Sequence, residues 1–289
     1  MTIHIITDGS SDLTPELASK FGIHIVPLNV QFGDDMYTSD MESKLFYQRM
    51  KEESELPKTS SPAPAAFYNM FKSLDADKDI FVLCLSATLS STYNHALMAK
   101  EMYEEEGHPN KVEVIDTKTT SIGLGLLAVR ATIMAKAGES LQEMKDTMKQ
   151  LAKQTNTFFS LDTLENVIRG GRLSRLKGSV ASMLNIKLVM RAADDGSVEM
   201  MEKVRGTQRA VKRLIDKVEE AWHQHADREW IAFAHSNCEE RAREFMNMIQ
   251  ENYPFNNVLL VNMGAVIGTY AGEGGLLVTF SQSDAATNE

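Results

Sequence analysis

The sequence is poor in cysteine and in long apolar runs. Only Cys84 and Cys238 occur in 289 residues, and each lies in or beside an apolar stretch. Two cysteines supply neither a disulfide framework nor a four-ligand zinc site, so we interpret both as small core or near-core residues. No run reaches the roughly 18 apolar residues of a membrane span, and the N-terminus lacks a basic segment followed by an apolar one. We therefore expect no integral membrane segment and a cytoplasmic location.

Positive charge is also scarce. The chain carries 30 Lys and Arg against 40 Asp and Glu, which gives a formal net charge of −10. Such a field repels nucleic acids and anionic membrane surfaces. The basic segment at residues 169–177 contains no aromatic residue that could stack on a base. We therefore expect no nucleic-acid partner.

Common catalytic motifs are absent as well. The sequence has no G-x-S-x-G, H-E-x-x-H or G-x-x-x-x-G-K-[ST] segment. Catalysis needs a nucleophile with its base or a cluster of metal ligands, and the sequence shows neither, whereas binding needs no such groups. We therefore expect a non-enzyme with no metal and no cofactor. The alternative is a phosphoryl-transfer or hydrolytic enzyme that uses Asp8, Asp12 and Asp116 as metal ligands or bases, since these acids lie in turns at strand ends.

The order of apolar and helical patterns predicts an α/β fold with two lobes. Strand and helix alternate through residues 1–155, which is typical of a parallel sheet flanked by helices. Residues 156–280 do not follow the same pattern of strands and helices, and they predict a second α/β lobe with a mixed or antiparallel sheet. The polar residues 281–289 predict a flexible tail. A ligand would bind between the lobes, near the carboxyl ends of the strands.

The stretch from Asp79 to Gly107 predicts a strand, a hydroxyl-rich turn and a helix. The turn at residues 86–92 contains five hydroxyl side chains in seven residues. The N-terminus of a helix offers unpaired N–H groups and a partial positive charge, so this turn could hold a carboxylate or a phosphate. The alternative is that Ser90 or Ser91 is simply the N-cap of the helix.

Other segments also predict strands and loops that surround a ligand. Residues 24–32 alternate and predict one strand, while the prolines and hydroxyls of residues 57–64 predict a stiff loop. Five glycines in residues 264–275 predict a loop in close contact with backbone or ligand. The G-x-G at residues 123–125 lies too far after its strand for a dinucleotide site, and tight helix packing explains it better.

An ordered set of motifs resembles the DegV family, the bacterial fatty-acid-binding proteins that partner a fatty-acid kinase. The resemblance covers about residues 1–280, and no single motif decides it. The motifs are T-D-G-S-S-D-L at 7–13, T-S-S-P at 59–62, L-S-A-T-L-S-S-T-Y at 85–93, G-x-G at 123–125, R-G-G-R-L-S at 169–174 and G-A-V-I-G-T-Y-A-G-E-G at 264–274.

The resemblance implies a fatty acid between two α/β lobes, with its carboxylate held by hydroxyl groups. Thr59 or Ser60 together with Ser90 would bind the head group, and Arg172 would serve the kinase-facing surface that handles the acyl phosphate. Four positions depart from the family pattern. Ser91 and Leu188 stand where the family usually has Gly and Pro, and Tyr270 and Glu273 stand in the last loop, which commonly reads T-H-x-G-P-G. We include Ser91 among the head-group candidates, together with Tyr270, whose hydroxyl could replace the histidine.

A sequestered carboxylate must have its oxygens hydrogen-bonded, and its hydrocarbon tail needs a long apolar slot. Our candidates for the slot lie in the second lobe, although ordinary core packing would explain each of them individually: Phe158, Met183, Leu184, Ile186, Leu188 and Met190. The expected function is a carrier, by default a monomer, that sequesters a long-chain fatty acid. It would present the carboxylate to a separate ATP-dependent fatty-acid kinase and retain the acyl phosphate for phospholipid synthesis.

Overall fold

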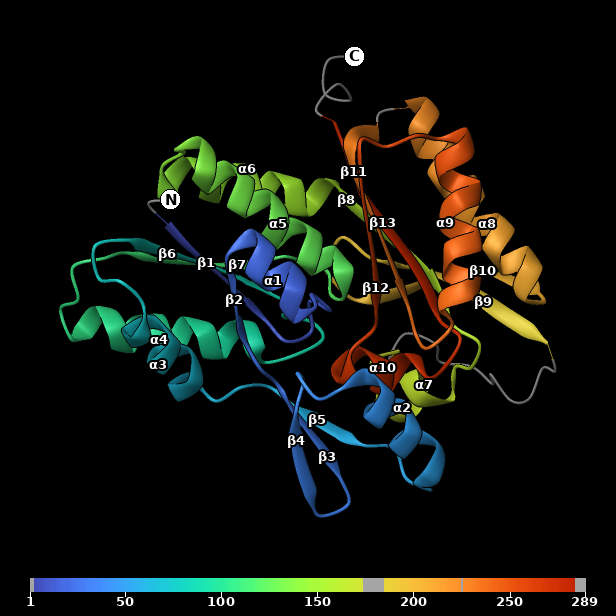
Figure 1. The fold of residues 1–289 in the computed structure, drawn as a ribbon, viewed down its shortest axis with the longest axis horizontal. Helices are drawn as coiled ribbons and strands as arrows, with labels where there is room; N and C mark the ends of the chain where they lie inside the picture. Colours follow the sequence, from blue (N-terminus) through green and yellow to red (C-terminus); the bar gives the residue numbers. More distant parts are fainter. Residues whose placement is uncertain (1–2, 174–184, 225, 284–289) are drawn as a thin grey trace.

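The computed structural model describes residues 3–173, 185–224 and 226–283 (Figure 1). Within them, the strands form three sheets. No helix in these three ranges is long and apolar enough to cross a bilayer. The α/β fold predicted from the sequence is confirmed.

The first sheet is parallel, with strand order β2-β1-β6-β7. The residues of its strands β1 and β6 are almost all buried, because helices cover both faces. The strands are β1 (Ile3–Asp8), β2 (Ile23–Val26), β6 (Asp79–Cys84) and β7 (Val112–Asp116). Helices α3 and α4 pack on one face, and α1, α5 and α6 cover the other (Figure 1). These helices are α1 (Pro15–Phe21), α3 (Pro64–Ser73), α4 (Thr92–Glu105), α5 (Ile122–Ala137) and α6 (Leu141–Gln154).

A small antiparallel sheet follows β2, with strand order β4-β3-β5. It corrects two expectations. Residues 24–32 form two strands in different sheets rather than one, because the chain leaves the first sheet after β2 at Pro27. Part of the expected loop at 57–64 pairs with β3 as a short edge strand. The elements here are β3 (Asn29–Phe32), β4 (Asp35–Thr38), β5 (Lys58–Ser60) and α2 (Ser43–Glu52).

The third sheet has the order β10-β9-β8-β13-β11-β12, and only β11 and β12 are parallel. The mixed sheet expected for the second half of the chain is thus confirmed. Its strands are β8 (Thr155–Ser160), β9 (Ile186–Ala192), β10 (Val198–Arg205), β11 (Ala226–His235), β12 (Asn257–Asn262) and β13 (Leu276–Gln282). Helices α8 (Thr207–Gln224) and α9 (Glu239–Asn252) cover one face, whereas α5 lies against the other. Short α7 (Glu165–Arg169) follows β8.

The predicted division near residue 155 falls where α6 meets β8 and the chain passes from the first sheet to the third. The predicted tail begins too early, since Ser281 and Gln282 belong to β13; residues 284–289 lie outside the described residues.

The expected glycine loop at 264–275 contains a helix, α10 (Ala265–Ala271). This helix packs on α2 and on the small sheet, in a cluster that includes Val30, Phe46 and Val266. A Cβ atom on Gly268 would lie 2.5 Å from a ring carbon of Phe46, so a glycine is required for this close approach. The late chain thereby covers a sheet built by the early chain.

Candidate functional site

A cavity lies where the first sheet, the small sheet, the third sheet and α10 meet. It offers about 130 Å³ to water-sized molecules, whereas one water needs only about 10–15 Å³. Its wall is mostly apolar. Among the apolar lining residues are Leu28, Leu85, Leu89, Phe159, Leu161, Val167, Met263, Val266, Ile267, Ala271 and Leu277.

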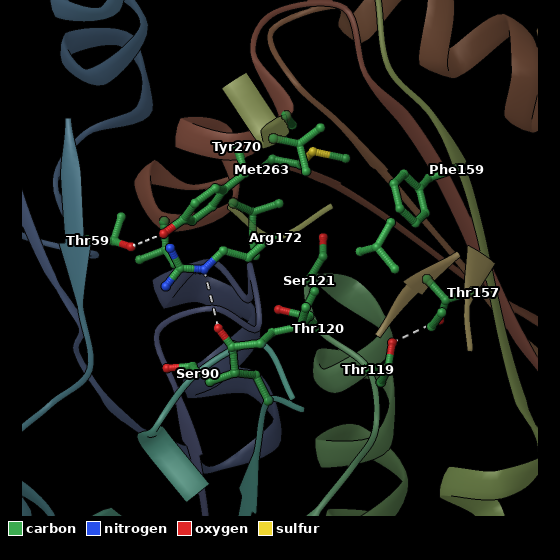
Figure 2. Close-up of a pocket in the computed structure, with 18 of the residues that line it drawn as sticks. Thr59, Ser90, Thr119, Thr120, Ser121, Thr157, Phe159, Arg172, Met263 and Tyr270 are labelled. Atoms are coloured by element: carbon green, nitrogen blue, oxygen red, sulfur yellow. Dashed lines mark hydrogen bonds between the residues drawn. The ribbon is translucent and has the colours of Figure 1, made fainter. Parts of the chain in front are cut away.

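Polar side chains gather at one end of the cavity. The Tyr270 hydroxyl lies 2.5 Å from Thr59 Oγ1, which joins α10 to β5. The guanidinium of Arg172 lies over the Tyr270 ring, 5.0 Å from its centroid. Arg172 also donates to the backbone carbonyls of Leu89, at 3.4 Å, and Gly170, at 2.6 Å. Figure 2 shows Arg172 between Tyr270 and Ser90, with Phe159 at the opposite end.

The turn before α4 contributes Ser90 to this end of the cavity. Ser90 Oγ accepts the backbone N–H of Thr92 at 3.3 Å and lies 2.9 Å from Thr92 Oγ1. The capping role weighed from the sequence is therefore present, although at Ser90 and not at the formal N-cap Ser91, whose side chain makes no capping bond. Ser91 is exposed and does not line the cavity.

The N-terminus of α5 forms the middle of the wall through Thr119, Thr120 and Ser121. Thr119 Oγ1 lies 3.0 Å from Thr157 Oγ1 of β8. A Cβ atom on Gly123 would lie 2.6 Å and 2.9 Å from these two oxygens. Tight packing therefore explains the G-x-G, as the sequence predicted.

Asp8 and Asp12 are buried immediately behind this wall. Asp8 accepts the backbone N–H groups of Ser10 and Leu85, at 2.9 and 2.8 Å, and the Ser10 hydroxyl at 2.6 Å. Asp12 accepts the Ser121 hydroxyl and the Gly264 N–H. Burial raises the pKa of Asp8 above its usual value, and raises that of Asp12 to about 7.

Asp116, the third acid of the enzyme alternative, is also engaged by its neighbours. It accepts the backbone N–H groups of Ala87 and Lys118 at 3.2 and 3.1 Å, and the Lys118 ammonium at 2.6 Å. All three acids thus hold loop backbone in place. No group of three or more His, Cys, Asp or Glu in the described ranges is arranged to hold a metal ion.

A family model described as "Uncharacterised protein, DegV family" matches residues 2–282. The chain belongs to the DegV family. The family resemblance stated from the sequence motifs is thereby confirmed. A DegV domain-containing protein of Listeria innocua is 30% identical over 289 residues, covering 96% of this chain and 98% of that protein.

Solved DegV-family structures have the same fold. A Ruminococcus gnavus protein, in a structure with vaccenic acid, is 30% identical with a TM-score of 0.89, covering 96% of this chain and 99% of its own. The Streptococcus pneumoniae Fatty Acid Kinase (Fak) B3 protein, loaded with linoleic acid, is 26% identical with a TM-score of 0.86, covering 98% and 100%.

The DegV cavity brings together some of the residues expected from the sequence and leaves others elsewhere. Thr59, Ser60, Ser90, Arg172 and Tyr270 line it. The remaining candidates do not: Ile186, Leu188 and Met190 pack in the main core and Phe158 packs with Phe280 behind the third sheet. Met183 and Leu184 lie outside the described residues.

Phe159 lines the cavity in place of its neighbour Phe158. Successive side chains of a strand point to opposite faces, and Thr157 and Phe159 share the face toward the cavity. The signal that could have found Phe159 is this alternation, read together with the apolar positions of β13 opposite it.

Proposed function

We propose that this DegV protein binds a long-chain fatty acid, with the hydrocarbon in the cavity and the carboxylate at the polar end. The observation that carries the proposal is the distribution of polarity: a mostly apolar wall has Ser90, Thr59, Tyr270 and Arg172 together at one end. Hydroxyl groups satisfy carboxylate oxygens that would otherwise cost several kcal/mol to bury. Fatty acids bound by the Ruminococcus and Streptococcus relatives support the same ligand class.

The hydrocarbon supplies most of the binding free energy in this proposal. Burying about a dozen methylenes at roughly 0.8 kcal/mol each yields about 10 kcal/mol, from which the costs of ordering are subtracted.

Mass spectrometry of the purified protein tests the ligand directly, because a fatty acid should co-purify or be taken up on incubation. A protein that does neither contradicts the proposal.

Ser90→Ala should weaken fatty-acid binding by roughly 1–3 kcal/mol if the carboxylate loses a partner. Ser91→Ala is the matched control, since Ser91 is exposed beside the cavity rather than in its wall. Equal affinities of the two variants would remove Ser90 from the head-group site.

We propose further that the protein presents this carboxylate to a separate ATP-dependent kinase, in the cytoplasm where ATP is available, and retains the acyl phosphate. Arg172 supports this step, because it is exposed at the polar end and its charge could neutralise a phosphate. Arg172→Ala should retain fatty-acid binding but slow phosphorylation by the kinase. Loss of both in equal proportion would contradict the assignment of Arg172.

A hydrolytic or phosphoryl-transfer enzyme in the same cavity is the second candidate. It would need Asp8, Asp12 or Asp116 as a metal ligand or base, and each of these carboxylates is already hydrogen-bonded to loop backbone. This use of the three acids favours the carrier.

A further inference from the structure

The ring of Tyr270 contacts two residues of the segment that follows α7. A Cβ atom on Gly170 would lie 2.5 Å from two ring carbons of Tyr270, so glycine is required for this close approach. The guanidinium of Arg172 lies over the same ring, 5.0 Å from its centroid. A cation over the face of a tyrosine is attracted by the negative charge of that face. The R-G-G-R motif at 169–172 thus supplies both the space for the ring and the cation that lies on it.

The hydroxyl of Tyr270 is engaged separately from its ring. It lies 2.5 Å from Thr59 Oγ1, a contact that joins α10 to β5. Two hydroxyl groups carry two protons, and the hydrogen bond between them uses one. Whichever oxygen donates in that bond, the pair retains one proton that can be donated to a carboxylate at the polar end of the cavity, which both residues line. The hydroxyl of Tyr270 therefore serves the head-group site of the proposed function.

Main-chain carbonyls also hold the guanidinium of Arg172. Nε donates to the carbonyl of Leu89 at 3.4 Å, and Nη1 donates to the carbonyl of Gly170 at 2.6 Å. Leu89 precedes Ser90 in the turn before α4, so the guanidinium lies between Tyr270 and Ser90 (Figure 2). These bonds place the positive charge at the polar end of the cavity without requiring a bond to the carboxylate.

The tyrosine ring adds to what the two carbonyls provide. Arg172 is exposed, and an exposed arginine samples many rotamers while water competes for the hydrogen bonds of its guanidinium. A flat ring matches the planar guanidinium and excludes water from one of its faces. In phosphoryl transfer, a cation that is already in place stabilises the charge of the transferred group without the cost of moving into position. The position of Arg172 therefore matters as well as its charge.

We propose that the ring of Tyr270 positions Arg172 for the transfer of a phosphoryl group to the bound fatty acid, whereas the hydroxyl of Tyr270 serves the carboxylate. The inference rests on the proposed function, because it requires a fatty acid and a kinase. In that step a carboxylate oxygen forms a bond to the γ-phosphorus of ATP while the bond to ADP breaks, which yields the acyl phosphate and ADP. Arg172 exchanges no proton and forms no covalent bond.

The variants Tyr270→Phe and Tyr270→Leu separate the two roles, because both lose the hydroxyl and only the first keeps a ring. Titration calorimetry with oleate should show binding that is weaker in both variants by a similar factor of roughly two to ten. Phosphorylation of the oleate-loaded protein by a fatty-acid kinase with ATP should differ between them. At saturating carrier concentration, we expect kcat for Tyr270→Leu to be roughly two- to fivefold below that for Tyr270→Phe.

The same pair in an Arg172→Ala background is the matched control. If the ring acts through Arg172, the two double variants should have the same kcat, because the ring then has no guanidinium to hold. A general structural defect in Tyr270→Leu would lower kcat in both backgrounds. The comparison therefore distinguishes positioning of Arg172 from mere support of the fold.

NMR of the isotope-labelled protein detects the stacking without kinase or ligand. The Nε–H signal of Arg172, identified by its absence from Arg172→Ala, should lie upfield of its position in Tyr270→Leu, because the ring current shields protons above the ring face. Tyr270→Phe should keep the upfield position. If Tyr270→Leu does not fold, comparison of this signal with those of other exposed arginines in wild type still decides whether the guanidinium lies on the ring.

The possible failures have distinct meanings. Absence of oleate binding, or of phosphorylation of loaded wild-type protein, would overturn the proposed function. Equal kcat values for Tyr270→Phe and Tyr270→Leu would overturn only the positioning role of the ring. A deficit of Tyr270→Leu that persists in the Arg172→Ala background would equally overturn that role, as would an unshifted Nε–H signal in wild type.

Discussion

Replacing Gly123 by alanine tests how closely α5 packs against the cavity wall. The new methyl group would lie 2.6 Å from Thr119 Oγ1 and 2.9 Å from Thr157 Oγ1, so the two threonines must separate. Overpacking costs about 1–3 kcal/mol, and loss of their hydrogen bond costs about 1 kcal/mol. Alanine recovers about 1 kcal/mol through its higher helix propensity. We expect a net loss of roughly 1–3 kcal/mol.

Thermal unfolding of the purified protein measures this loss. A change of 1 kcal/mol shifts the Tm of a protein of this size by about 2 °C, so the Tm should fall by roughly 2–6 °C. The double variant Thr119→Ala, Gly123→Ala is the matched control, because removing the threonine side chain makes room for the methyl group. It should be more stable than the sum of the single changes predicts. A Tm for Gly123→Ala at or above that of wild type would refute the close packing.

Three further predictions concern the cavity and its support. Phe159→Ala should weaken fatty-acid binding, because Phe159 lines the cavity. Phe158→Ala should leave binding intact and lower the free energy of unfolding by about 3–5 kcal/mol, so a binding assay and urea unfolding distinguish the two variants. Burial raises the pKa of Asp12 to about 7 in the folded state, whereas the unfolded chain has the ordinary value of 3.8. Stability relative to Asp12→Asn should therefore fall by about 3 kcal/mol as the pH rises from 4 to 7, as measured by urea unfolding. Ser140→Ala should cost about 1 kcal/mol by the same assay, since Ser140 forms a capping box with Glu143.

The sequence predicted those elements whose signals are local. The short apolar run at residues 80–86 identified β6, because a parallel strand covered on both faces needs no polar positions. The hydroxyl-rich turn before α4 followed from N-terminal chemistry that involves only neighbouring residues. Four of the five predicted head-group residues line the cavity, since the motifs that contain them lie at element ends.

The remaining features depend on contacts between distant parts of the chain. Glycines predicted a loop around α10, but Gly268 is required only because Phe46, more than 200 residues earlier, packs against the helix. Phe158 and Phe159 are both apolar, and both faces of β8 are covered, so composition alone does not tell which of them faces the ligand. In the first half of the chain, the sequence identified cavity-lining residues only within the quoted motifs, such as Thr59 and Ser60 in T-S-S-P at 59–62.

The position of α10 has a consequence during synthesis of the chain. Until residue 271 has emerged from the ribosome, Val30 and Phe46 lack the contacts that α10 makes with the small sheet and with α2, and the polar end of the cavity lacks Tyr270. A nascent chain can thus complete the first parallel sheet while the apolar surface that α10 later covers is still exposed to solvent. Shortened products that stop before α10 should therefore aggregate or be degraded, because the cavity wall is complete only after α10 has been synthesised.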